Sequence, residues 1–128
     1  MADYADFTRT MTRADIHKFR FTVKDRITGA IQDITNWQKF WVSVKVKPTD
    51  ADPGLFQKTS SGGGIALITP TSGLAEGTIA SADTNVAAVP YIRTTYLMGI
   101  RGKDPSGNIW TLARGQLVVL PEITRATS

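Results

Sequence analysis

The chain has 128 residues, of which 41% are hydrophobic and 20% charged, and its net charge is +4. These values are ordinary for a single globular domain and argue against a disordered chain. Because the sequence contains no cysteine, disulfides, thiolate chemistry and cysteine-based zinc sites are excluded.

The chain is expected to have one folded unit between two short terminal segments. We predict a flexible N-terminal arm over residues 1–13, a β-sandwich domain over 14–123 and a C-terminal tail over 124–128. The first 15 residues lack the apolar core of a signal peptide. No run reaches the roughly 18 apolar residues that cross a bilayer, so no membrane partner is expected.

Two segments in the first half alternate apolar and polar residues with the period of a half-buried strand. They are KFRFTVKD at 18–25 and FWVSVKVKP at 40–48, and Pro48 is expected to end the second strand. Between them, Thr28-Gly29 predicts a turn, and 33–36 predicts a tight turn or a single helical turn. The apolar faces hold Phe19, Phe21 and Val23 in the first segment, and Phe40, Val42, Val44 and Val46 in the second.

The middle of the chain alternates loops with short strands. Short strands are predicted near 55–58, over 65–68 and over 76–82. The glycine-rich connection at 60–64 lacks both the Walker lysine and the glycine spacing of a dinucleotide loop, so we interpret it as a hairpin connection. The segment 83–90 predicts one helical turn, capped by its Asp or Thr and ended by proline.

The C-terminal part predicts a closing hairpin. A strand over 91–102 has Tyr96, Met98 and Ile100 on one face, and an Asp-Pro-Ser-Gly turn leads to a return strand over 109–121. Gly115 within that strand predicts a bulge. The run LVVL is apolar on both faces, so a loop or a neighbouring chain is expected to cover it. Seven or eight such strands with almost no helix predict an all-β antiparallel sandwich or barrel.

No catalytic, cofactor-binding or metal-binding residues are expected, and the chain is predicted not to be an enzyme. His17 is the only histidine, and no G-x-S-x-G motif accompanies it, so a structural or edge position is favoured. The aspartates lie mostly in turns, where turn chemistry explains them. Asp50-Ala-Asp52 resembles the start of a calcium loop but lacks the glycine and the terminal glutamate.

The aromatic residues suggest an interaction surface. Trp41 lies on the polar face of a strand whose other face is already apolar, and Trp37 precedes it in a turn. Exposed tryptophans are often interface anchors, although Trp41 could instead pack under a loop or a second sheet layer. The predicted interface consists of Trp37, Trp41, Phe7 and Tyr4. The densest basic set, within 18–26, is too sparse to predict nucleic-acid binding.

The order of these elements resembles the immunoglobulin-like β-sandwich domains of tailed-phage virion proteins, and the N-terminal domain of the phage baseplate upper protein family is the nearest pattern. The resemblance covers roughly residues 14–123. It departs from the family pattern at Asn36, where glycine is usual, and in its longer TSSGGG connection. The matching features are IHKFRFTVKD, the turn at 33–36, the valine strand at 40–46, Gly77-Thr78-Ile79, the helical turn before Pro90, the Asp-Pro-Ser-Gly hairpin and WTLARGQLVVLPEI.

The resemblance implies an immunoglobulin-like sandwich and a non-enzymatic structural protein of the virion. Such a protein would be a tail or baseplate adaptor or a capsid-associated protein, assembled in the host cytoplasm. Its partners would be other virion proteins, in a homo-oligomer or other symmetric assembly, and it would need no cofactor. The alternative is a carbohydrate-binding sandwich that recognises a host-surface glycan, with Tyr91, Tyr96, Trp110 and Trp41 as stacking candidates.

Overall fold

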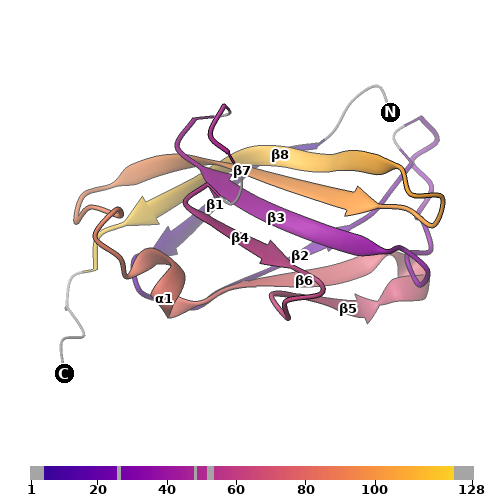
Figure 1. The fold of residues 1–128 in the computed structure, drawn as a ribbon, viewed down its shortest axis with the longest axis horizontal. Coiled ribbons are helices and arrows are strands. Elements are labelled where there is room, and N and C mark those ends of the chain that lie inside the picture. Colours follow the sequence, from indigo (N-terminus) through magenta and orange to yellow (C-terminus); the bar gives the residue numbers. More distant parts are fainter. Residues whose placement is uncertain (1–4, 26, 48, 52–53, 123–128) are drawn as a thin grey trace.

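The structure is a computed structural model that describes residues 5–25, 27–47, 49–51 and 54–122. It is a β-sandwich in which a five-stranded sheet, in the order β1-β8-β7-β3-β4, faces a three-stranded sheet, in the order β2-β6-β5 (Figure 1). A 3-10 turn, Pro70–Ser72, and a helical turn, α1 (Ser81–Thr84), complete the fold. Among these residues, no helix has the length and apolar character needed to cross a membrane. The strands are β1 (Ala5–Thr12), β2 (His17–Thr22), β3 (Lys39–Lys45), β4 (Phe56–Thr59), β5 (Ile65–Thr69), β6 (Leu74–Ile79), β7 (Thr94–Lys103) and β8 (Ile109–Leu120).

The all-β sandwich prediction is confirmed, and the predicted apolar faces form the core between the sheets. The inward side chains of β3 and β7 are almost completely buried, and Phe19 faces them from β2. Val46 is the exception, because β3 ends at Lys45 and leaves Val46 60% exposed. The alternation of apolar and polar residues therefore predicted the buried face correctly for the residues that lie within the observed strands.

The flexible arm predicted over residues 1–13 is wrong for the residues of it that the structure describes. Residues 5–12 form β1, which pairs in parallel with the whole second half of β8. Met11 is 5% exposed and Phe7 packs partly buried against the core. The segment looked unstructured because its remaining side chains are mostly threonine and arginine, so only two apolar residues mark its buried side. The predicted tail at 124–128 lies outside the described residues.

The last strand needs no second chain to cover it. Leu117, Val118 and Val119 are 0%, 4% and 1% exposed within this chain alone. The expected bulge at Gly115 is also wrong, because the register between β7 and β8 shifts at Leu112 instead. Gly115 serves a different purpose: a Cβ there would overlap the carbonyl oxygen of Phe7, so glycine allows β1 to approach β8 closely.

The helical turn predicted over 83–90 forms earlier, at α1. Its start is fixed by Asp83, whose carboxylate accepts a hydrogen bond of 2.7 Å from the backbone amide of Ala80. The hydroxyl of Thr84 accepts a hydrogen bond of 2.8 Å from the amide of Ala14, which ties the turn to the end of β1. Asp83 therefore caps the turn from its third helical position, and not as the residue that precedes the helix.

A buried arginine fastens the loop after α1 to the neighbouring C-terminal ends of β1 and β8. Arg13, 3% exposed, donates hydrogen bonds to the carbonyl oxygens of Val86 and Val89 at 3.0 Å each. It also donates to Glu122 at 2.9 Å and to Asn85 at 3.1 Å, and its guanidinium lies 4.0 Å from the Tyr91 ring centroid. We call this group of contacts the Arg13 clasp.

Candidate functional site

An open hollow of about 1150 Å³ crosses the outer face of the five-stranded sheet, on the side away from the core. We call it the Trp41 groove. The groove runs perpendicular to the strands, because its lining residues come from neighbouring strands of the sheet. Its principal lining residues are Trp41, Ser43, Lys45, Gln57, Leu97, Gly99, Arg101, Arg114 and Gln116.

Small residues form the floor of the groove. Ser43 pairs with Gly99 across β3 and β7, and a Cβ built on Gly99 meets no atom within 4 Å. The Ser43 hydroxyl accepts a hydrogen bond of 2.9 Å from the side-chain amide of Gln57 on β4. The floor therefore consists of small residues and is polar.

Larger side chains form the two walls. Trp41 and Arg101 are directly paired on one side of the floor, and Lys45 and Leu97 are paired on the other. Trp41 and Lys45 lie four residues apart on β3 and point to the same face. A strand rises about 3.3 Å per residue, so the two walls are about 13 Å apart. The spacing and the open top suit an extended ligand better than a small enclosed one.

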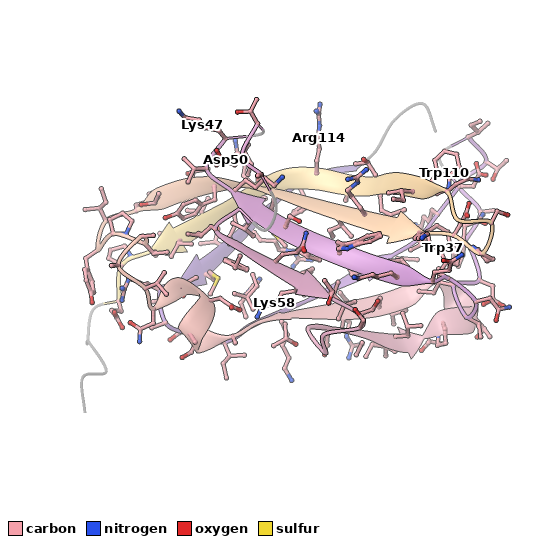
Figure 2. The ribbon with its side chains drawn as sticks, viewed as in Figure 1. Trp37, Lys47, Asp50, Lys58, Trp110 and Arg114 are labelled. Atoms are coloured by element: carbon pink, nitrogen blue, oxygen red, sulfur yellow. The ribbon has the colours of Figure 1, made fainter. Side chains whose placement is uncertain are left out.

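The groove lies in a strongly basic part of the fold. Strands β3, β4, β7 and β8 contain no aspartate or glutamate. Lys58 contributes little to the groove, because it pairs with Asp83 of α1 at 2.6 Å. Figure 2 shows Arg114 projecting from β8 away from the three-stranded sheet. The basic residues of the four strands are Lys39, Lys45, Lys58, Arg101, Lys103 and Arg114.

One cation lies close to the Trp41 ring, and a second lies on the opposite wall of the groove. The ammonium of Lys39 lies 5.3 Å from the centroid of the Trp41 ring. The ammonium of Lys45, on the opposite wall, donates a hydrogen bond of 2.9 Å to the carbonyl oxygen of Asp50 and so holds the loop after β3. The aromatic ring is therefore presented together with positive charge.

The structure places two of the four predicted interface residues, Trp41 and Phe7, along the groove. Trp41 lines the groove, whereas Trp37 stacks on Phe40 with ring centroids 5.4 Å apart and lies with Trp110 at one end of the sandwich (Figure 2). Phe7 lies on β1, where it packs partly buried against the core and also lines the groove. Tyr4 lies outside the described residues.

The other aromatic residues considered for stacking on sugars have structural roles. Tyr96 is 3% exposed, and the indole nitrogen of Trp110 donates a hydrogen bond of 2.9 Å to Asp104. Tyr91 lies against the guanidinium of Arg13. Of the four, Trp41 alone lines the groove.

Among the described residues, the side chains with shifted pKa values belong to separate strands and turns. Burial, with a smaller contribution from Arg9, lowers the pKa of His17, and its buried Nε2 has no hydrogen-bond partner. Hydrogen bonds from Thr28 and Ile27 lower the pKa of Asp25, which holds a turn. Among residues 5–122, apart from the few positions not described, no three His, Asp or Glu side chains are grouped to hold a metal ion.

Two further turn aspartates behave in the same way. Hydrogen bonds from Thr35 lower the pKa of Asp33, and a hydrogen bond from Trp110 lowers the pKa of Asp104. These carboxylates accept hydrogen bonds within their own turns, so they explain local structure rather than chemistry.

Sequence reasoning missed Arg101 and the glycine floor. The alternation of β7 was sufficient to place Arg101 on the outer face of its strand, because the preceding residue, Ile100, points to the core. Its neighbour Trp41 lies 60 positions earlier, so only the pairing of β3 with β7 brings the two together. Comparison of the chain with known protein families and with curated proteins finds no match.

Proposed function

We propose that this chain is a non-enzymatic structural protein of a tailed-phage virion, a tail or baseplate adaptor or a capsid-associated protein, that acts through protein–protein contacts. The Trp41 groove carries the proposal. It is a wide, open surface with a tryptophan beside an arginine, the residue types that dominate binding energy in protein interfaces. Its partners are other virion proteins, and its place is the virion.

The strand order supports the immunoglobulin-like part of the proposal. If β2, β3, β5, β6, β7 and β8 are the strands B, C, D, E, F and G, the sheets contain B-E-D and G-F-C, as in immunoglobulin-type sandwiches. Strand β4 then takes the place of the additional C′ strand beside C. The first strand differs, because β1 pairs in parallel with β8 and not with β2.

Repeated contact is the expected mode of action. In a symmetric assembly, the same surface meets the same partner in every copy, so contacts that are weak individually become strong together. A groove that is open along its length and spans five strands can receive part of a partner protein without closing around it.

The test is quantitative mass spectrometry of virions assembled in cells that supply the chain as wild type, Trp41→Ser or Ile92→Ser. Ile92 is the matched control, because it is an apolar side chain 66% exposed in a loop outside the groove. We expect wild type and Ile92→Ser in virions at equal copy number and Trp41→Ser reduced by about tenfold or more.

Two results would contradict the proposal in different ways. Absence of the wild-type chain from virions rejects the virion role. Equal incorporation of Trp41→Ser, with an unfolding midpoint close to that of wild type, rejects the groove as the contact surface.

A carbohydrate-binding module is the second candidate, and the polar floor beside Trp41 favours it. Ser43 and Gln57 offer a hydroxyl and an amide next to an aromatic ring, as sugar-binding sites do. Binding of the wild-type chain, but not of Trp41→Ser, to a defined structure on a glycan array would support this function. No signal on such an array removes it.

A further inference from the structure

We infer that the Trp41 groove binds an acidic, extended segment of a partner protein. This inference rests on the proposed assembly function and names the chemistry of the partner. Three observations support it: the charge of the sheet, the dimensions of the groove and the surroundings of Trp41.

Four of the five strands of the sheet carry charged residues of one sign, while β1 carries Asp6, which is paired in register with Arg114. The four strands that contribute most of the groove contain no carboxylate and six basic residues, of which Lys58 is already paired with Asp83 of α1. Lys39 and Lys103 are directly opposite each other in register, an arrangement that costs stability because like charges repel. A ligand that carries carboxylates relieves this repulsion.

Arg101 is the residue best placed to meet a carboxylate. It is exposed, it lies in the wall beside Trp41, and no hydrogen bond or ion pair joins its side chain to another residue that the structure describes. A guanidinium can bind a carboxylate through two parallel hydrogen bonds, which fixes orientation as well as charge.

The dimensions suit a short extended segment. The groove reaches from Gln57 on β4 to Thr8 on β1, across five strands. Strands are about 4.8 Å apart, so this span is about 19 Å, the length of about six extended residues. Leu97 and Ile109 add apolar contacts for the side chains between the acidic ones.

The same observations argue against other occupants. Sugars and nucleobases stack on open aromatic faces, but the ammonium of Lys39 lies over the Trp41 ring. A second copy of this chain is a poor source of the segment, because its carboxylates are scattered and no six-residue stretch of its sequence contains more than two of them. A partner with a different, acidic sequence fits best.

The test is fluorescence anisotropy of labelled hexaglutamate titrated with the full chain, with labelled hexaglutamine as the neutral comparison. We expect hexaglutamate alone to bind, and its affinity to fall by about tenfold between 50 and 300 mM NaCl. Arg101→Gln is expected to weaken binding by about tenfold, whereas Arg93→Gln, an exposed arginine outside the groove, leaves it unchanged.

Several results would overturn the inference. They are equal binding of hexaglutamine, equal binding of hexaglutamate to Arg101→Gln, or no binding at millimolar peptide. Tighter, Arg101-dependent binding of polygalacturonate or of a hexathymidylate oligonucleotide would assign the groove to a sugar acid or a nucleic acid instead.

The two proposals can fail separately. If hexaglutamate does not bind but Trp41→Ser still lowers incorporation into virions, the assembly function stands and the acidic partner is rejected. If hexaglutamate binds at the groove but the wild-type chain is absent from virions, the ligand chemistry stands and the virion role is rejected.

Discussion

Arg13 shows how much one side chain can organise. Its guanidinium contacts the loop after α1 and Glu122, which follows β8, and it lies on the Tyr91 ring. Arginine suits this position because its planar group presents five donors in a fixed geometry, which a lysine ammonium cannot reproduce. The conformation of residues 85–91 therefore depends on a residue more than 70 positions earlier.

We expect Arg13→Met to destabilise the fold by about 3–5 kcal/mol, because it leaves Glu122 and two loop carbonyl groups without their buried partner. Urea unfolding measures the loss, and hydrogen exchange in residues 85–91 should rise with it. Arg93→Met, at an exposed arginine, is the control and should change stability by less than about 0.5 kcal/mol. If Arg13→Met lowered the free energy of unfolding by no more than the control does, the Arg13 clasp would contribute little to stability.

His17 makes stability depend on pH. Burial keeps the pKa of His17 in the folded chain below its usual 6.5, so the unfolded chain binds the proton more readily. Stability is therefore complete above pH 6.5 and falls as the pH decreases toward the lowered pKa. We expect a lower urea midpoint at pH 5.5 than at pH 7.5 in wild type, and no such difference in His17→Gln.

The turn aspartates do not interfere with that measurement. The pKa values of Asp25, Asp33 and Asp104 are lowered from 3.8, so these carboxylates are ionised in both states above pH 5. Their stabilising contribution is present above pH 3.8 and is lost only as the pH falls below it. An unchanged pH dependence in His17→Gln would assign the effect to another group.

At the scale of elements, the pairing of β1 with β8 depends on a missing side chain. A methyl group on Gly115 would overlap the carbonyl oxygen of Phe7 on β1, whereas a methyl group on Gly99 would point into the open groove. The two glycines lie on neighbouring strands of the same sheet, which makes them a matched pair for experiment.

We expect Gly115→Ala to lower stability by about 1–3 kcal/mol, because β1 must move away from β8. Gly99→Ala should change it by less than about 1 kcal/mol and in the stabilising direction, since glycine is unfavourable in a strand. Thermal unfolding compares the two, and hydrogen exchange at β1 amides shows whether the loss is local. Equal stability of the two variants would contradict the close approach.

The elements that sequence analysis predicted correctly are those with a regular apolar face. Alternation located β2, β3, β7 and β8, because each of these strands has one face in the core. It missed β1, where Phe7 and Met11 are separated by three polar positions. It also misread Gly115, since a glycine that makes room for another strand looks the same in sequence as one that forms a bulge.

The candidate site was predicted only in part for a related reason. Trp41 could be found because it breaks the polar face of its own strand. Arg101 could not be joined to it, because the partner of a strand is decided by packing of the whole sheet and not by local pattern. Trp37 looked like a surface residue, yet it covers Phe40 and the backbone at Gly102.

At the scale of the whole molecule, charge is distributed unevenly. Most aspartates lie in turns and loops, while β3, β4, β7 and β8 carry basic residues alone. Like charges on one surface repel and lower stability unless salt screens them. The fold therefore keeps a surface that is unfavourable for the isolated chain.

We expect the unfolding temperature to rise with salt. Between 20 and 300 mM NaCl the gain should be about 1 kcal/mol, or about 4 °C for a chain of this size. Arg101→Gln should have a higher unfolding temperature than wild type at 20 mM NaCl, and that temperature should rise less with added salt. The unfolding temperature of Arg93→Gln should depend on salt as that of wild type does. A salt response that is identical in all three chains would show that the groove is not under electrostatic strain.

The parallel pairing of β1 and β8 also decides how the molecule bears load. Because the two strands run in the same direction, the start of β1 and the end of β8 lie at opposite ends of the sandwich (Figure 1). Tension applied at Ala5 and Leu120 therefore pulls the two strands past each other along their length. Their evenly spaced hydrogen bonds must then fail together and not one at a time. The pairing of β1 with β8 therefore resists a pull between these two residues along the length of the strands.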